Sequence, residues 1–327
     1  MTCLHKKLTL MLCAALGSAL AAASLPQTGP YPEANPPTPE KIALGRALFF
    51  DPLLSEDGKV ACATCHRPDR AFTDGGAVST GAFGRTGKRS APSLINVAYR
   101  TRLFWHGGSP SLELQALGPL SDHNEHALQP EQIVEILRAS RYAPEFKRIF
   151  GREPDLTALT QAIASFERTL VSYDSPFDRY QSGDAHALTA SQVRGMDLFY
   201  DRAECFHCHN GNNFSDNLPH NNASELFNED IGVAQLSGQD ADVGKFITPT
   251  LRNIALTAPY MHAGQMKTLR EVVQHYNGGG QANPNTDPLV RPLGLTDQEV
   301  TDLVAFLEAL TDPTIATNKA FGPPEIP

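Results

Sequence analysis

Two stretches, Cys62-Ala63-Thr64-Cys65-His66 and Cys205-Phe206-His207-Cys208-His209, follow the pattern C-x-x-C-H. This pattern is the attachment signature of a c-type haem, in which two thiols add to the vinyl groups of the porphyrin and the adjacent histidine binds the iron. The spacing suits this chemistry, because two cysteines on one turn reach both vinyl groups while the next side chain points at the metal. Two such motifs predict two covalently attached haems, with His66 and His209 as proximal iron ligands.

A zinc ribbon is the main alternative for four cysteines in two pairs. A ribbon does not require a histidine directly after each second cysteine, and 139 residues lie between Cys65 and Cys205. That separation is too long for one small metal module. The spacing therefore favours two haem sites over one zinc site.

The N-terminus has the pattern of a secretory signal peptide. Basic residues precede an apolar stretch over residues 8–23, and Ala21-Ala22-Ala23 supplies the small residues of a cleavage site. We therefore expect residues 1–23 to be a signal peptide. The mature protein is expected in the periplasm, with no membrane anchor.

Removal of this segment changes both the cysteine count and the charge. Cys3 and Cys13 leave with it, so the four remaining cysteines are those of the haem motifs and no disulfide framework is expected. The loss of Lys6 and Lys7 takes the formal net charge from −9 to −11. A chain this acidic argues against nucleic acid as a partner and is compatible with a protein partner.

The segments before the two haem motifs are similar to each other. Residues 40–50 and 189–200 both have a helical pattern, and the second begins with a Thr189/Gln192 capping box. Each contains the sequence G-x-x-L-F, at residues 45–49 and 195–199. The chain is therefore predicted to be an internal repeat of two cytochrome-like units.

Other patterns complete the expected fold. Apolar residues at helical spacing predict further helices over 159–170 and 300–310, the latter after a Thr296/Glu299 capping box, while strand-like alternation is sparse. We expect an all-α fold of two cytochrome c-like domains joined by long loops, each with one haem. The domains are predicted to cover residues 24–182 and 183–327.

The motifs outside the haem sites form an ordered set along nearly the whole mature chain. With this set the sequence resembles the bacterial di-haem cytochrome c peroxidases and, within that superfamily, the MauG group. The motifs are Arg89-Ser90-Ala91-Pro92, Phe104-Trp105-His106-Gly107, Ser175-Pro176-Phe177-Asp178-Arg179-Tyr180, Thr248-Pro249-Thr250-Leu251-Arg252-Asn253 and Ala258-Pro259-Tyr260-Met261-His262.

The resemblance implies an enzyme with a division of labour between its domains. Hydrogen peroxide is reduced at the haem of the N-terminal, peroxidatic domain. A periplasmic partner, either a protein electron donor or a protein substrate, is oxidised through the haem of the C-terminal, electron-transfer domain. The MauG group implies oxidation of a protein substrate.

The resemblance also implies roles for three residues between the haem motifs. Trp105, the only tryptophan, stands where the family has an aromatic ring that relays electrons between the haems. Gln115 and Glu125 match the family's distal glutamine and catalytic glutamate. A carboxylate there can take the proton from the iron-bound peroxide oxygen and return it to the departing oxygen, and burial would raise its pKa toward the working range. His123 and His126 flank Glu125 as competing acid–base candidates.

The axial ligands of the two irons are expected to differ. No histidine occurs between His66 and His106, where many di-haem peroxidases have a histidine that blocks the first haem, so this haem is expected to be five-coordinate at rest. Tyr276 lies fourteen residues after His262, where MauG-like proteins have tyrosine and electron-transfer peroxidases have methionine. The resemblance thus implies Tyr276 as the second axial ligand of the second haem. A phenolate is a hard donor that stabilises oxidised iron.

Three other side chains remain alternatives for this ligand, namely Met261, Met266 and His275, of which His275 is the main competitor. The remaining histidines, His186 and His220 among them, are expected at the surface.

A calcium ion commonly lies between the domains in this family, held partly by main-chain carbonyls. Thr257 and Pro259 match those carbonyl positions. Ser90 stands where the peroxidases supply an asparagine oxygen, so the resemblance implies a calcium site with one altered ligand.

Two other functions remain open. A conventional cytochrome c peroxidase would detoxify peroxide with electrons from a small cytochrome or copper protein. A di-haem electron carrier would have both irons fully ligated and no role for Glu125. The sixth ligand of the second haem separates the first alternative from a MauG-like enzyme, and reaction with peroxide separates the second.

Overall fold

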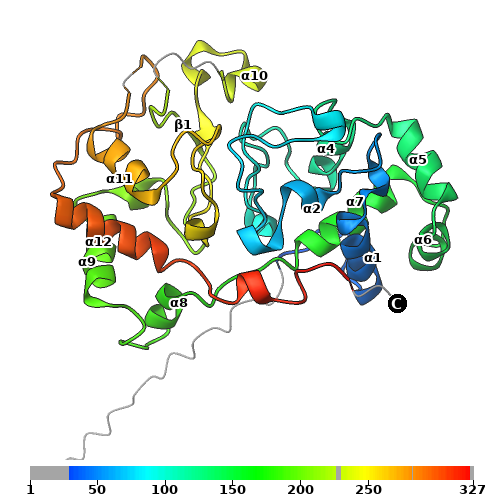
Figure 1. Cartoon of the computed structure of the whole chain (residues 1–327), viewed down its shortest axis with the longest axis horizontal. Coiled ribbons are helices and arrows are strands. Elements are labelled where there is room, and N and C mark those ends of the chain that lie inside the picture. Colours follow the sequence, from blue (N-terminus) through cyan, green and yellow to red (C-terminus); the bar gives the residue numbers. More distant parts are fainter. Residues whose placement is uncertain (1–28, 226–229, 282, 325–327) are drawn as a thin grey trace, which may run out of the picture.

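The structure, a computed structural model, describes residues 29–225, 230–281 and 283–324, so the predicted signal peptide lies outside the described residues. Two lobes of helices and long loops lie side by side, one from α1 to α7 and the other from α8 to α12 (Figure 1). The helices are α1 (Pro39–Phe50), α2 (Cys62–Cys65), α3 (Leu112–Gln115), α4 (Leu117–Ser121), α5 (Pro130–Ala139), α6 (Ala143–Phe150), α7 (Leu156–Glu167), α8 (Pro176–Gln181), α9 (Ala190–Tyr200), α10 (Ala234–Ser237), α11 (Leu269–Asn277) and α12 (Asp297–Glu308).

The mostly helical fold with two cytochrome c-type units is confirmed. Within the described residues the sheet content is one antiparallel pair, β1 (Pro219–His220) and β2 (Phe246–Ile247). Short 3₁₀ turns shape the loops, at Pro52–Leu54, Pro68–Arg70, Ala82–Gly84, Val97–Tyr99, Cys205–His207, Asp240–Asp242, Ile254–Leu256 and Ile315–Thr317. None of the described helices is long and apolar enough to cross a bilayer.

The glycines of the two G-x-x-L-F sequences make equivalent close contacts. Gly45 of α1 approaches α7 so closely that a Cβ atom there would lie 1.9 Å from the carbonyl oxygen of Ala162. Gly195 of α9 approaches α12 in the same way, and a Cβ atom would lie 1.9 Å from the carbonyl oxygen of Asp302. Because only glycine fits such a crossing, the repeated motif sets the same helix packing in both lobes.

The phenylalanines of the same motifs lie at the centres of the two cores. Phe49 packs edge-on against Phe166 of α7, and Phe199 packs edge-on against Phe306 of α12, with ring centroids 5.2 Å apart in both pairs. All four rings are almost fully buried. Burial of such rings is a main contribution to the stability of each lobe.

The two hydrophobic cores do not separate at residue 182, the predicted boundary between the domains. Phe177 of α8 packs against Phe306 in the second core, whereas Ile315 and Phe321 belong to the first core. The segment after α12 crosses back to the first lobe (Figure 1), where Arg46 of α1 donates to the carbonyl oxygen of Gly322 at 2.8 Å. The C-terminal segment therefore ties the two lobes together.

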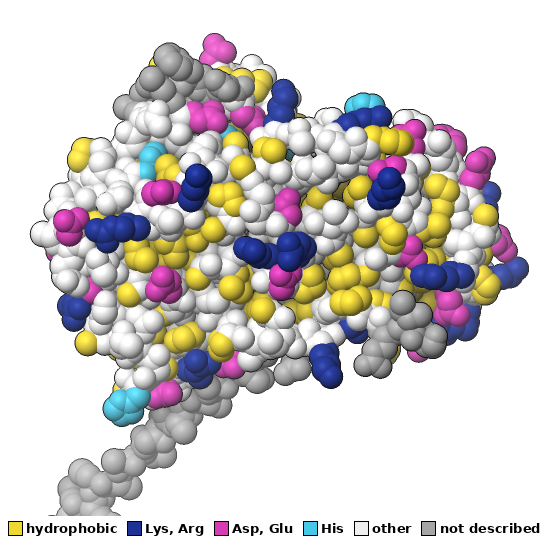
Figure 2. Space-filling view, viewed as in Figure 1, with side chains coloured by type: hydrophobic (Ala, Val, Ile, Leu, Met, Phe, Trp, Pro, Cys, Tyr) yellow, Lys and Arg dark blue, Asp and Glu magenta, His cyan; other side chains and the backbone are white. Residues whose placement is uncertain are grey.

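Charged groups are mixed on the surface. Figure 2 shows Lys and Arg interspersed with Asp and Glu on the face in view, with apolar patches between them and no large area of one sign. The negative net charge of the chain is therefore not concentrated on this face.

Candidate active site

The two motif histidines have the same support. His66 Nδ1 lies 2.9 Å from the carbonyl oxygen of Phe72, and His209 Nδ1 lies 3.0 Å from the carbonyl oxygen of Phe214. A carbonyl oxygen only accepts, so Nδ1 carries the hydrogen and Nε2 is left with a lone pair. Burial lowers the pKa of both histidines and favours the neutral form that binds metals.

The first motif forms one wall of a cavity in the first lobe, with an empty volume of about 540 Å³ that is partly open to solvent. Gln115, the last residue of α3, lies in its lining together with Glu125 and His126, which follow α4. The structure thus brings the first motif together with the two residues expected on the open face of the haem. The segment between His66 and His106 contains no histidine, but His126, which lies later in the chain, does line this cavity.

The loop that carries Glu125 is held by its backbone. Glu125 N donates to the carbonyl oxygen of Asp122 at 3.0 Å, and its own carbonyl oxygen accepts from Ala82 N at 2.7 Å. Gly81 lies so close that a Cβ atom would be 2.1 Å from the carbonyl oxygen of Asn124. The glycine-rich loop over residues 75–87 therefore packs directly on the segment that presents Glu125.

The pKa of Glu125 is shifted in the direction that proton transfer near neutral pH requires. Its side chain is exposed, but it lines the cavity, and the surrounding protein limits its contact with bulk solvent. This burial, together with the negative charge of Asp122, raises the pKa of Glu125 to about 7. A carboxyl group with that pKa can both accept and release a proton at pH 7.

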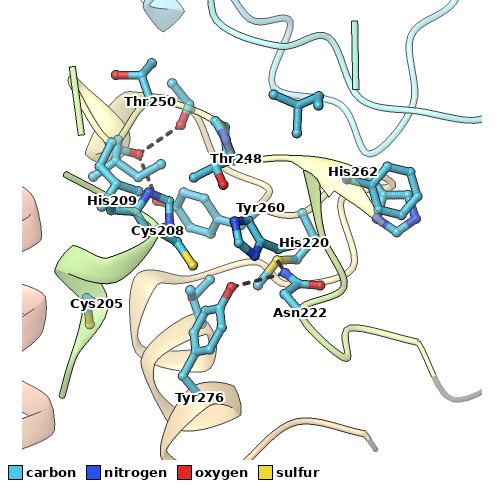
Figure 3. A pocket seen from close by; sticks show the side chains of 18 of the residues that line it. Cys205, Cys208, His209, His220, Asn222, Thr248, Thr250, Tyr260, His262 and Tyr276 are labelled. Atoms are coloured by element: carbon cyan, nitrogen blue, oxygen red, sulfur yellow. Dashed lines mark hydrogen bonds between the residues drawn. The ribbon is translucent and has the colours of Figure 1, made fainter. Parts of the chain in front are cut away.

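The second motif faces a larger cleft, with an empty volume of about 1630 Å³ that is partly open to solvent. Its lining includes Cys205, Cys208 and His209 on one side and Tyr276 of α11 on another. Figure 3 shows the hydroxyl group of Tyr276 directed into the cleft. Burial raises the pKa of Tyr276 to about 12.

Asn222 contacts Tyr276 and two of its three rivals. Its Nδ2 donates to the hydroxyl oxygen of Tyr276 at 3.1 Å, the bond drawn in Figure 3, and to the sulfur of Met261, also at 3.1 Å. His275 Nε2 donates to its carbonyl oxygen at 2.8 Å. The third rival, Met266, is not among the residues that line the cleft. The sequence analysis did not predict a role for Asn222, because it is one of several asparagines in a polar loop.

Trp105 lies in the wall of the second cleft, although it belongs to the first lobe. Its Nε1 donates to the carbonyl oxygen of Ser90 at 2.8 Å, and its carbonyl oxygen accepts from Ile247 N, also at 2.8 Å. Ser90 of the first lobe therefore holds the indole ring, and Ile247 of the second lobe holds the backbone of Trp105.

The three residues of the expected calcium site line the same cleft. Ser90 uses its hydroxyl group to donate to the carbonyl oxygen of Met261 at 3.1 Å, and its backbone N donates to that of His262 at 2.7 Å. Thr257 and Pro259 lie in the lining beside them. Calcium stays a prediction, and Ser90 has a structural role that does not depend on it.

His220 differs from the expectation of a surface position. It lines the second cleft, and its Nε2 and Nδ1 lie 2.9 Å and 2.6 Å from carboxylate oxygens of Asp216 and Asp287. Asp287 lies far along the chain, so no local pattern marks this arrangement.

Two buried groups that no motif marks help to test whether haem fits these cavities. Arg100 lines the second cleft, and its Nε has no hydrogen-bond partner among the described residues. Burial lowers its pKa to about 10, so the guanidinium stays charged at neutral pH and requires an anion. Haem carries carboxylates, and the four cysteines of the motifs are free thiols. The donor set and the unpartnered cation therefore fit a covalently attached haem.

Glu167 of α7 is the second such group. It lines the first cavity, is 5 % exposed, and its Oε2 has no partner among the described residues. Burial raises its pKa to about 8, so it is mostly protonated at neutral pH.

Comparisons with known proteins agree with the assignment of a haem to each cavity. Residues 39–186 match the family model of di-haem cytochrome c peroxidases, and residues 192–311 match that of cytochrome c. The methylamine utilization protein MauG of Methylorubrum extorquens is 41 % identical over 87 % of this chain and 82 % of that protein. The chain belongs to the di-haem cytochrome c peroxidase family. It is therefore an oxidoreductase that acts on hydrogen peroxide, with two covalent haems implied by its two cytochrome c units.

Other members of the family are also similar to this peroxidase. The cytochrome-c peroxidase IdrP1 of Denitromonas iodatirespirans is 38 % identical over 93 % of this chain and 92 % of that protein. A crystal structure of a MauG-like protein associated with microbial copper homeostasis superimposes with a TM-score of 0.86 and 34 % identity, over 92 % of this chain and 99 % of that one. Members of the family are periplasmic in bacteria and exchange electrons with a protein partner.

Proposed function

We propose that this di-haem peroxidase is MauG-like and uses hydrogen peroxide to oxidise a protein substrate by long-range electron transfer through its second haem. The observation that carries the proposal is Tyr276, which faces the cleft of the second motif and receives a hydrogen bond from Asn222. A phenolate ligand favours oxidised iron over reduced iron. Such a site is suited to holding an oxidising equivalent and poorly suited to receiving electrons from a high-potential donor.

We assign the haems as follows. Cys62, Cys65 and His66 would hold the first haem, and Cys205, Cys208, His209 and Tyr276 would hold the second. When bound, the first haem would supply the iron that binds peroxide, and the pair of haems would store the oxidising equivalents.

The remaining roles belong to residues of the protein itself. We place Glu125 in the proton transfer between the two peroxide oxygens, and Gln115 beside it as a polar group that orients the peroxide. Trp105, fixed between the lobes through Ser90 and Ile247, is assigned to electron transfer between the haems. We also propose one calcium ion held by Ser90, Thr257 and Pro259, which metal analysis of the purified protein would test.

Peroxide detoxification with a small cytochrome or copper protein as donor is the second candidate, favoured by the similarity to IdrP1. A comparison of the wild-type protein with Tyr276→Met separates the two. If the protein is MauG-like, the wild-type enzyme turns over slowly with a reduced small cytochrome as donor, and Tyr276→Met turns over faster. Rapid wild-type turnover with that donor would contradict the MauG-like assignment.

Addition of one equivalent of peroxide to the diferric protein tests the enzyme against a plain electron carrier. We expect a rapid change in the Soret spectrum. In Glu125→Gln this change should be slower by about 10² to 10⁴, the usual contribution of a positioned acid–base group. An unchanged wild-type spectrum would identify an electron carrier.

A further inference from the structure

The first cavity contains a titratable side chain that the proposed function leaves without a role. His126 directly follows Glu125, lines the same cavity, and is only 4 % exposed. Its Nδ1 lies 2.5 Å from the carbonyl oxygen of Leu54. Since the carbonyl can only accept, Nδ1 carries the hydrogen, and Nε2 carries a lone pair.

The position of this ring is fixed by its backbone as well. His126 N donates to the carbonyl oxygen of Pro119 at 3.1 Å, and its own carbonyl oxygen accepts from Glu56 N at 2.9 Å. The bond from Nδ1 to a carbonyl is the one that orients His66 and His209. His126 therefore resembles the two proximal histidines in having Nδ1 bound and Nε2 available, but it lies on a segment beside Glu125.

Different environments separate the acid–base properties of the two neighbours. Burial lowers the pKa of His126; His66 lowers it further, while the carbonyl of Leu54 and the charge of Asp57 oppose this. Burial and Asp122 raise the pKa of Glu125 to about 7. At neutral pH the imidazole is therefore neutral, while a large fraction of Glu125 carries a proton. Two groups tuned in opposite directions form a base and an acid.

We propose that His126 is the proton acceptor and Glu125 the proton donor at the peroxide site, an inference that rests on the proposed function. His126 Nε2 takes the proton from one peroxide oxygen, the inner oxygen, which stays in the site. Glu125 gives its proton to the other peroxide oxygen, the outer oxygen. The O–O bond breaks, and its electron pair leaves with the outer oxygen as water. Proton transfer from His126 to Glu125 then restores the pair. The inner oxygen leaves as the second water with two protons from solvent and two electrons from the protein partner.

The first test is the pH dependence of the stopped-flow rate of the peroxide-induced spectral change in the holoprotein. The variants are His126→Gln, Glu125→Gln and the double variant, with His123→Gln as control, because His123 is exposed on the same loop and pairs with Arg85. We expect a bell-shaped wild-type profile whose alkaline limb falls near pH 7, the pKa of Glu125. His126→Gln should lower the maximal rate by about 10² and abolish the acid limb. The double variant should be little slower than the slower single variant, since the two groups act as one unit.

The second test does not depend on turnover. Hydrogen cyanide must lose its proton when it binds ferric iron, so a neighbouring base that takes the proton strengthens binding. His126→Gln should weaken cyanide binding by about tenfold or more, as expected for the loss of one hydrogen bond to a charged group, and should leave the high-spin resonance of the first haem unchanged. His126→Asn, whose amide can keep a bond to Leu54, replaces His126→Gln if that variant attaches haem poorly.

The outcomes are distinct. A first haem that changes from low spin to high spin in His126→Gln would make His126 an iron ligand and overturn the inference. A wild-type rate that only rises with pH and equals that of His126→Gln would show that Glu125 acts alone, leaving the proposed function intact. A wild-type protein that does not react with peroxide would remove the proposed function itself, and the inference with it.

Discussion

The side-chain amide of Asn222 donates a hydrogen bond to the hydroxyl oxygen of Tyr276 at a distance of 3.1 Å. Burial raises the pKa of Tyr276 to about 12, and this bond acts against the rise by stabilising the phenolate. The same asparagine engages Met261 and His275. One residue thus favours the anionic form of the expected ligand and occupies two of its competitors.

The ligand assignment predicts that Tyr276→Phe abolishes the low-spin resonance signal of the second haem, because phenylalanine offers no donor atom. The measurement is electron paramagnetic resonance of the ferric protein. His275→Phe is the matched control and should keep the signal. The reverse pattern would identify His275 as the ligand.

The position of Trp105 predicts that Trp105→Phe uncouples the two haems. The variant loses the bond to Ser90 and the more easily oxidised ring, so the first haem should still respond to peroxide while most of the response of the second haem disappears. Resolved stopped-flow spectra check this. Tyr200→Phe, at an aromatic residue that is 43 % exposed, serves as control and should respond at both haems.

The environment of Glu125 predicts the effect of Asp122→Asn. The charge of Asp122 is one cause of the raised pKa of Glu125, so its removal should lower that pKa. The alkaline limb of the peroxide reaction should therefore move to lower pH, by up to about one unit. Asp69→Asn, at an exposed aspartate, should leave the limb in place, and an equal shift in both variants would exclude a local effect.

Glu167 predicts a pH-dependent loss of stability. Its folded pKa of about 8 lies above its ordinary value of 4.5, so the folded state keeps a proton that the unfolded state releases. Stability linked to this group is complete below pH 4.5 and is lost as the pH rises toward 8. Glu167→Gln removes this dependence, so its gain in unfolding free energy over wild type should grow across that range to a few kcal/mol. Denaturant unfolding at several pH values tests this, with Glu131→Gln on the exposed face of α5 as control.

The buried pair between two family motifs predicts a large effect on stability. Arg252 donates to both carboxylate oxygens of Asp178, at 2.9 Å and 3.0 Å, and both side chains are at least nine-tenths buried. Arg252→Met leaves an unpaired buried carboxylate and should lower the unfolding free energy by about 3 to 5 kcal/mol. Lys147→Met breaks the exposed pair with Glu153 and should cost about 1 kcal/mol or less. Similar losses in the two variants would contradict this explanation.

Several features were predictable because they are local along the chain. The haem motifs bring their own cysteines and histidine within one turn. The capping boxes at Thr189 and Thr296 form within four residues, and both are present in the structure. The repeated G-x-x-L-F sequence indicated the repeat of the two units, because both units need a glycine at the same helix crossing.

Other features depend on segments that meet only after folding. Asn222 and Tyr276 are 54 residues apart, and His220 and Asp287 are 67 apart, so no spacing rule connects them. Within the described part of the chain the Nε of Arg100 has no hydrogen-bond partner, and this also depends on burial, which sequence alone does not measure.

By itself, the sequence determined where the two C-x-x-C-H motifs lie, the approximate positions of α1, α7, α9 and α12, and the repeat of the two units, because short-range chemistry governs each of these. Only the tertiary structure decided which polar groups face each cavity and which neighbours shift their pKa values. Desolvation and hydrogen bonding depend on what surrounds a group in space, and in the second cleft those surroundings come from both lobes.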